Sequence, residues 1–503
     1  MVHINIGSIF RRSRRSETSQ NQEKDDKRET RPQVALAVQH FLINIGLGMS
    51  MGHSAVLLPQ LKEEADSGLQ VDEETGSWIA SVYMLVSPLG CFLGGVLLEK
   101  IGRRSGVLLG QGVYIVGWTV IAAAQNSTMM ICGRILDGIA ILFDEMAHPR
   151  LRVTVLCLAS SFLSSGTLVM SSIGSFLHWR TAAALAAVPS IIHIVIVAFL
   201  VYETPVYFVK KGKMKEAEKA LYWLWGQRKI KVKQELENLA TRLQKHETED
   251  KSDDHQQGGC WKILKNKEQY FEAYILKSFL IIHIFNLLQI PGGMGLITLY
   301  TVDILNAVQG SVQVVDGNVA TIVISAVKVV FLLLSSYLLY RVGRRPMAVI
   351  SGIGSALPAL ATAAILYCQS GRILDLDHGT LAWLNFVLVL LYVASNTLGF
   401  YCLTYTMIGE LLPAKVRGFL FGYIMALNYL VGGGFAKAYP LMLRAMGMEG
   451  LFLMFGLSCL LCTLFVFLLL PETLGRTLEE IEDYFHQPNI MWISRKRNDG
   501  DVS

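Results

Sequence analysis

Short motifs of charged residues occur twice in the 503-residue chain, in the same order. Ile-Gly-Arg-Arg at 101–104 corresponds to Val-Gly-Arg-Arg at 342–345. Guanidinium groups bind carboxylates through charge-assisted hydrogen bonds, and cations also bind the carbonyl groups at helix C-termini. The two motifs therefore predict a network of ion pairs that is built twice, at equivalent ends of two sets of helices.

Glutamates recur together with these arginines. Glu145 precedes Arg152 by seven residues, as Glu410 precedes Arg417, and Glu203-Thr204 corresponds to Glu472-Thr473. We expect Glu145 and Glu410 to face the arginines and to latch the helix ends together in one conformation of the protein. In the alternative, the arginines only set membrane topology and pair with nothing. The predicted network comprises Glu99, Arg103, Arg104, Arg134, Glu145, Arg152, Glu203, Arg344, Arg345, Glu410, Arg417 and Glu472.

Some ionisable residues lie inside apolar segments, among them Arg134, Asp137 and Lys328. Arg134 and Asp137 are spaced i, i+3, so they can neutralise one another on one helix. Lys328 lies in the middle of its apolar segment, with no acidic residue one turn away. A lysine in that position is costly unless it faces a cavity or a partner, which makes it a candidate functional residue. The alternative is a neutral or snorkelling lysine.

The apolar residues come in long blocks, as expected of helices that cross a bilayer. The chain is 52% hydrophobic and only 17% charged, with a mean hydropathy of +0.41. A spanning helix needs ~20 apolar residues. The fourth block, taken from Met129 to Phe143, is short at ~22 Å. We interpret the following ranges as twelve spans, six before and six after a polar stretch: 34–59, 76–98, 105–124, 128–143, 153–175, 180–201, 270–297, 319–340, 346–368, 381–407, 419–441 and 450–470.

The basic residues predict the orientation of these spans. With the N-terminus inside, the inner segments hold 37 of the 45 Lys and Arg residues, and inner loops carry such an excess. Both termini are therefore expected in the cytosol. The predicted parts are a disordered tail (1–33), a first half (34–202), a cytoplasmic loop with short helices (203–269), a second half (270–473) and a C-terminal tail (474–503).

From these motifs the chain is identified as resembling the sugar-porter family of the major facilitator superfamily, and in particular facilitated trehalose transporters and related hexose transporters. The resemblance covers about residues 34–485. It implies an all-α fold of twelve helices in two six-helix halves. The motifs that carry it include Gly76-Ser77-Trp78-Ile79, Glu99 through Arg104, Gly133-Arg134, His148 through Arg152, Tyr300-Thr301-Val302-Asp303, Gly409-Glu410, Pro413 through Gly418, and Pro471 through Arg476.

The resemblance also implies a central solute site, which departs from the family pattern. The helix 7 Gln-Gln pair is Gln289-Ile290, and the asparagine five positions after Ile290 is Gly295. Lys328 takes the place of a helix 8 amide. The first helix lacks an acidic residue between 34 and 59, where the ionisable side chains are the histidines His40 and His53, which favours facilitated diffusion over proton symport. The predicted solute-binding residues are Ser160, Gln289, Ile290, Gly295, Tyr300, Lys328, Tyr405 and Asn428.

These observations predict a plasma-membrane transporter of a small solute, a trehalose- or hexose-class sugar, by alternating access. The alternatives are a non-transporting membrane sugar sensor, a transporter of another, anionic solute, and a proton-coupled sugar symporter. No metal cluster or nucleophile–base pair is evident in the sequence, so we expect neither an enzyme nor a cofactor. The lipid bilayer is an expected partner, and nucleic acid is not.

Overall fold

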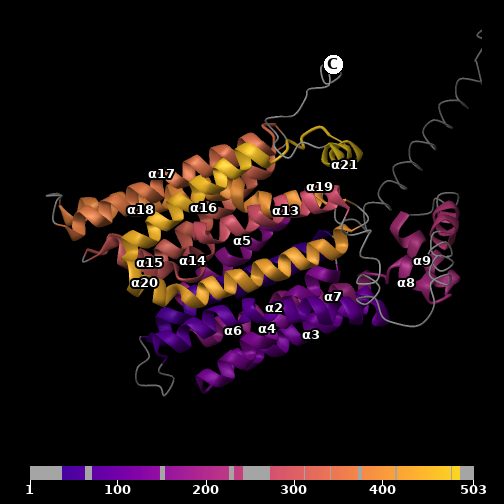
Figure 1. The fold of residues 1–503 in the computed structure, drawn as a ribbon. Helices are drawn as coiled ribbons and strands as arrows, with labels where there is room; N and C mark the ends of the chain where they lie inside the picture. The colour runs from indigo at the N-terminus through magenta and orange to yellow at the C-terminus, as the bar shows by residue number, and fades with distance from the viewer. Residues whose placement is uncertain are drawn as a thin grey trace, which may run out of the picture.

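Every regular element in the described part of the chain is a helix. The computed structural model describes residues 35, 37–62, 71–147, 153–225, 232–241, 272–310, 312–339, 341–371, 377–413, 416–476 and 478–487. The predicted N-terminal tail, residues 242–269 of the predicted cytoplasmic loop and most of the predicted C-terminal tail lie outside these residues. Long helices run side by side in two groups, which Figure 1 shows below and above the centre of the molecule.

The helices that precede residue 201 form one group, called here the N-terminal group. Asp72 caps its second helix, because its carboxylate accepts a hydrogen bond from the Thr75 backbone N–H at 3.1 Å. Bonding to Thr75 lowers the pKa of Asp72. The members are the helix Ala37–Lys62, α2 (Glu73–Ile101), α3 (Arg103–Ala122), α4 (Ser127–Ala147), α5 (Val153–Phe176), α6 (Trp179–Ala186) and α7 (Val188–Leu200).

The helices between residues 273 and 469 form the C-terminal group. Its longest helix, α20, has 53 residues and would be ~80 Å long if it were straight. The backbone is non-helical at Gly447, where the chain turns into a second arm (Figure 1). The members are α13 (Ala273–Gln289), η1 (Ile290–Gly292), α14 (Met294–Leu299), α15 (Thr301–Gln309), α16 (Gly317–Leu338), α17 (Arg344–Ser370), α18 (His378–Asn396), η2 (Thr397–Tyr401), α19 (Cys402–Leu411) and α20 (Arg417–Leu469).

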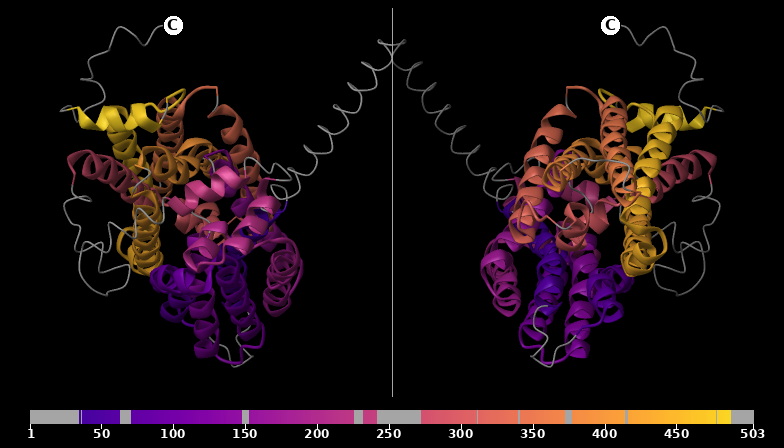
Figure 2. Two further views of the ribbon diagram at one scale, coloured as in Figure 1. Left: turned by 90° about the vertical axis from the view of Figure 1, so that its right-hand side faces the viewer. Right: turned by 90° about the vertical axis from the view of Figure 1, so that its left-hand side faces the viewer.

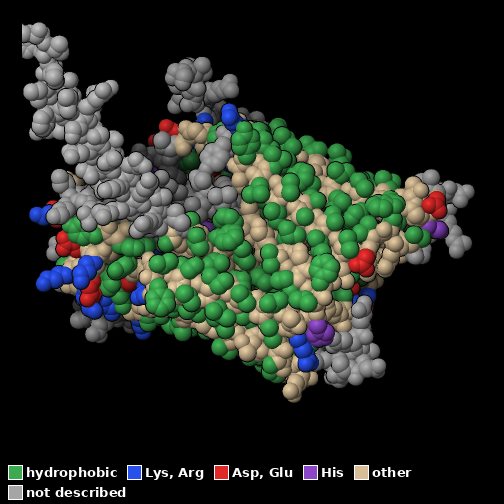
Figure 3. Space-filling view, turned by 180° about the vertical axis from the view of Figure 1, so that it is seen from behind, with side chains coloured by type: hydrophobic (Ala, Val, Ile, Leu, Met, Phe, Trp, Pro, Cys, Tyr) green, Lys and Arg blue, Asp and Glu red, His purple; other side chains and the backbone are tan. Residues whose placement is uncertain are grey.

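Eight helical segments of the described chain are long and apolar enough to cross a membrane. They are Ala37–Lys62, Arg103–Ala122, Trp179–Leu200, Ala273–Gly292, Gly317–Leu338, Arg344–Ser370, His378–Leu411 and Leu420–Leu469. Hydrophobic side chains cover the middle of the face in Figure 3, and charged side chains gather toward its ends. An apolar surface this broad matches a lipid environment and not water. The chain is a multi-pass membrane protein.

The prediction that the fourth span is short was wrong. α4 has 21 residues, which gives ~31 Å and is enough to cross the hydrocarbon core. The Asn126 side chain accepts a hydrogen bond from the Met129 N–H at 2.8 Å, so the helix begins before the apolar block does. It also continues through Asp144 and Glu145 to Ala147. Hydropathy marks the apolar part of a helix, whereas its ends depend on capping and backbone hydrogen bonds.

Two helices of the C-terminal group are broken near their middles. Between α13 and α14, Pro291 supplies no backbone N–H and Gly293 has φ 83°. A Cβ at Gly293 would lie 2.3 Å from the Phe455 ring, so the close packing there needs a glycine. Between α18 and α19 lies a π-helical turn, Thr397–Tyr401. Such π turns redirect side chains within a helix and are frequent at functional sites.

Short helices follow the N-terminal group. α8 (Pro205–Lys210) and α9 (Met214–Trp225) lie at the end of the bundle that carries Gly102 and the two arginines after it, called here the motif end (Figures 1 and 2). The Tyr207 hydroxyl donates to the Lys100 carbonyl at 3.3 Å, which fixes α8 there. α9 is amphipathic, with Ala217, Ala220 and Leu221 buried.

Candidate functional site: a central cavity between two groups of helices

At the motif end, a glutamate caps the first Gly-Arg-Arg turn. The two carboxylate oxygens of Glu203 accept hydrogen bonds from the backbone N–H groups of Arg103 and Arg104, at 2.9 and 3.0 Å. Gly102 has φ 90°, and a Cβ there would lie 2.4 Å from that carboxylate. The Arg104 side chain donates to the Ala198 carbonyl near the end of α7, at 2.6 Å. The motif thus joins the start of α3 to the end of α7.

The second motif has the same arrangement. Glu472 accepts from the backbone N–H groups of Arg344 and Arg345, both at 3.0 Å, and Gly343 has φ 98°. The Arg345 side chain donates to the Phe467 carbonyl near the end of α20, at 2.5 Å. The repeat in the sequence is therefore a repeat in structure, in which each carboxylate stabilises the positive end of a helix within its own group.

Glu410 belongs to the second motif as well. It lies 2.7 Å from Nη2 of Arg344, and it accepts a hydrogen bond from the Thr473 hydroxyl at 2.5 Å. Arg417 donates to the Leu412 carbonyl. These contacts stay within the second half of the chain, so in this conformation Glu410 binds residues of its own half. The side chains of Glu99, Glu145 and Arg152 lie outside the described residues, and the predicted latch involving Glu145 stays a prediction.

At the opposite end of the bundle, ion pairs join the two groups. Lys62 lies 2.9 Å from Asp303, and Arg444 lies 2.5 Å from Glu73. Lys437 donates to the Ser77 hydroxyl at 2.8 Å, and its ammonium lies 4.4 Å from the centre of the Trp78 ring. These contacts close the bundle at this end, called here the closed end.

Inside the N-terminal group, Arg134 and Asp137 form a fully buried pair. Nη1 of Arg134 lies 3.5 Å from Oδ2 of Asp137, and both side chains are 0% exposed. The Ser50 hydroxyl donates to Asp137, and Nη2 of Arg134 lies 2.9 Å from Nδ1 of His53. His53 acts as the acceptor in that contact, because a guanidinium can only donate. The pair is therefore compensated by groups on the first helix.

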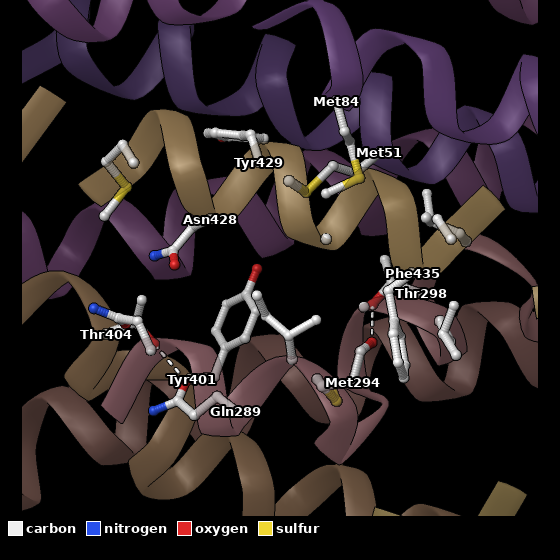
Figure 4. Close-up of a pocket in the computed structure, with 18 of the residues that line it drawn as sticks. Met51, Met84, Gln289, Met294, Thr298, Tyr401, Thr404, Asn428, Tyr429 and Phe435 are labelled. Carbon is white, nitrogen blue, oxygen red and sulfur yellow. Dashed lines mark hydrogen bonds between the residues drawn. The ribbon is translucent and has the colours of Figure 1, made fainter. Parts of the chain in front are cut away.

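A cavity of about 190 Å³ lies between the groups, with walls from both. Met51 and Met84 of the N-terminal group face α13, α14 and α20 across it (Figure 4). It is smaller than the roughly 300–1,000 Å³ of pockets that bury drug-sized ligands, so it suits a small solute. Five of the eight predicted solute-binding residues line it, namely Gln289, Ile290, Gly295, Tyr405 and Asn428.

The other three predicted solute-binding residues do not line the cavity. Ser160 is buried on α5, away from its walls. The Tyr300 ring stacks on Tyr439 at 4.2 Å, and its hydroxyl donates to the Ala436 carbonyl at 3.0 Å. Lys328 is 2% exposed and lies behind the wall, with Nζ donating to the Thr298 hydroxyl at 3.0 Å.

Several polar residues of the cavity were missed at the sequence level. Asn286 is 2% exposed and lies one turn before Gln289, so the i, i+3 spacing on one helix could have indicated it. Thr404 donates to the Gln289 side chain at 2.6 Å (Figure 4). Thr298, Asn396 and Tyr401 also line the cavity. Tyr401 ends the π turn of η2, a feature that the sequence does not indicate.

The fold is that of a major facilitator superfamily transporter. The solved structure of the proton:xylose symporter XylE of this superfamily, bound to 6-bromo-6-deoxy-D-glucose, superposes with a TM-score of 0.68 at 16% sequence identity, over 90% of this chain and 100% of that one. An inward-open structure of XylE from E. coli gives a TM-score of 0.66 and covers 90% of this chain and 99% of that one. At this identity the likeness concerns the fold alone.

The chain belongs to the family described as "Sugar (and other) transporter", which it matches over residues 21–485. Facilitated trehalose transporter Tret1 of Drosophila erecta is 30% identical over 460 residues, which are 90% of this chain and 51% of that protein. The Tret1-2 homolog of Drosophila simulans is 29% identical over 460 residues, 90% of each chain. The chain spans about half the length of the first of these relatives. The family consists of transporters and not of enzymes, in agreement with the sequence-based prediction.

Proposed function

We propose that the protein is a secondary transporter that carries a sugar across the plasma membrane by facilitated diffusion. The observation that carries the proposal is the cavity shared by the two groups of helices. Among the described residues, the ion pairs that join the two groups lie at the closed end alone. A site between two halves, closed on one side, is what alternating access requires.

The proposed topology has twelve spans in two six-helix halves, 34–202 and 270–473, joined by the segment 203–269. The two arms of α20, and the lengths of α2, α4 and α5, support this count beyond the eight candidate spans. The excess of Lys and Arg in alternate loops supports cytosolic termini. In that orientation the motif end faces the cytosol and the closed end faces outward, so the conformation described is closed to the outside.

The chemistry of the cavity supports a hydroxylated solute. Amide and hydroxyl groups that both donate and accept hydrogen bonds line it, from Asn286, Gln289, Asn428 and Thr404. The named relatives are trehalose transporters, which supports the trehalose or hexose class. Facilitated diffusion is supported by the buried pair of Arg134 and Asp137, since each charge is already compensated within the protein.

Counterflow in reconstituted vesicles tests the proposal. Vesicles loaded with unlabelled glucose or trehalose should accumulate the same labelled sugar from outside, and they should do so without a proton gradient. Asn286→Ala should reduce this accumulation, whereas Thr119→Val, on an exposed face of α3, should leave it unchanged. Sugar binding without any counterflow on the same preparation would instead identify a non-transporting sensor.

A further inference from the structure

Lys328 places a positive charge directly behind the wall of the central cavity. Its Nζ donates to Oγ1 of Thr298 at 3.0 Å and lies 5.3 Å from the centre of the Tyr401 ring. Thr298 and Tyr401 both line the cavity, and Figure 4 shows their side chains at its wall. A solute that contacts either residue would therefore be within a few ångströms of the ammonium group.

This charge has no anionic partner in the part of the chain that the structure describes. Among the described residues, Lys328 contacts no carboxylate, and of the residues that line the cavity none is charged. The buried ions Arg134 and Asp137 of the N-terminal group pair with each other. An ammonium has three N–H donors, of which Thr298 accepts one. A buried charge is costly unless it is paired and hydrogen-bonded. A ligand anion would provide that pairing.

The remaining polar groups of the cavity suit hydroxyls. Both the amide nitrogen and the amide oxygen of Asn286 are buried without a hydrogen-bond partner, and so is the amide oxygen of Asn428. Each of these side chains lines the cavity. They offer donors and acceptors to a ligand that carries several hydroxyl groups, as a sugar does. The cavity is thus lined by amides without partners, and the ammonium of Lys328 lies directly behind its wall.

We propose that the preferred solute is a hydroxylated carboxylate, that is, a sugar acid, with Lys328 as its counter-ion. The proposal rests on the transport function proposed above and specifies its substrate class. A neutral sugar would engage the amides but would leave the ammonium unpaired. A simple carboxylate would pair with the ammonium but would leave the amides unpartnered. A sugar acid satisfies both sets of groups.

The test compares the counterflow rate of labelled D-glucuronate with that of labelled D-glucose in vesicles that contain the purified full chain. We expect glucuronate to be moved at least tenfold faster than glucose, and unlabelled glucuronate to inhibit glucose movement. Lys328→Gln should abolish this preference, and Lys328→Arg should retain much of it. Lys213→Gln, which removes an exposed lysine before α9, is the matched control and should change neither rate.

Different outcomes separate the two proposals. Transport of glucose at least as fast as that of glucuronate in the unmodified protein, or an unchanged preference in Lys328→Gln, overturns the sugar-acid proposal and leaves sugar transport standing. If no solute moves at all, the transport function fails. A binding measurement then tests the sugar-acid site. Glucuronate should raise the melting temperature of the unmodified protein and not that of Lys328→Gln. The absence of any such rise overturns the sugar-acid proposal.

Discussion

Glu410 and Arg344 lie 66 positions apart in the sequence and form a close ion pair, in which Nε and Nη2 of the guanidinium donate to the carboxylate and the shortest distance is 2.7 Å. Both side chains are nearly buried, at 8% and 10% exposure. The pair joins the start of α17 to the end of α19. It is present while the bundle is closed at its other end, so it holds one half together in this conformation.

Glu410→Gln is expected to destabilise the protein by on the order of 3 kcal/mol, because removing one partner leaves a largely buried guanidinium uncompensated. The melting temperature of the detergent-solubilised protein measures this loss. Glu216→Gln, at an exposed pair with Lys213, is the control and should have no measurable effect. A melting temperature equal to that of the control would show that the pair contributes nothing to the stability of this half.

The equivalent caps formed by Glu203 and Glu472 predict matched effects in the two halves. Gly102→Ala and Gly343→Ala should each lower the melting temperature, since both positions have positive φ and a Cβ would approach the capping carboxylate. Gly112→Ala on α3 is the control, because nothing lies within 4 Å of its Cβ position. Loss of stability in one half and not in the other would contradict the structural equivalence of the motifs.

The ion pairs at the closed end predict a shift of conformation. Asp303→Lys should weaken closure by replacing attraction to Lys62 with repulsion, and the second change Lys62→Asp should restore it. The pair is partly exposed, so the gain from each contact is below about 1 kcal/mol. Reactivity of a cysteine introduced at Met294 toward an externally added, membrane-impermeant thiol reagent measures the opening, in a protein without other reactive cysteines. Equal reactivity in all variants would mean that other contacts close this end.

The buried pair of Arg134 and Asp137 predicts a strong stability effect. Asp137→Asn should lower stability by about 3–5 kcal/mol, because Arg134 would be left as an unpaired ion in the N-terminal group. Combining Asp137→Asn with Arg134→Leu should recover part of the loss, since no charge then remains to be compensated. Thermal unfolding of the unmodified protein, Asp137→Asn, Arg134→Leu and the double variant gives the coupling energy between the two positions. Purely additive losses would contradict a direct interaction.

The proposed topology predicts the location of inserted tags. Tags at residue 20, within 246–259 and at the C-terminus should bind antibody only after the cells are permeabilised, because loops rich in Lys and Arg stay in the cytosol. A tag inserted at 372–376, in a predicted outer loop, is the positive control for surface staining. Staining of intact cells at any of the first three positions would refute the assignment.

The sequence alone determined the helical membrane fold, the family and the charged motifs, because hydropathy and repeated short motifs are local patterns. It also predicted Gln289, Tyr405 and Asn428 as solute-binding residues, and the structure places their side chains at the central cavity. It missed the length of α4, since the helix extends beyond its apolar residues in both directions. It missed Asn286 and Tyr401 as well, because the direction of a side chain depends on helix packing and on the π turn before α19.

Only the tertiary structure decided which charges meet. The sequence left open which glutamate of the motifs pairs with which of the four arginines, Arg103, Arg104, Arg344 and Arg345. The fold assigns Glu203 and Glu472 to the backbone of their own halves and Glu410 to Arg344. The structure likewise set Lys328 behind Thr298 and Tyr401, and left it without a carboxylate among the described residues. Pairing depends on distances between segments that are far apart in the chain, and no local pattern of residues encodes those distances.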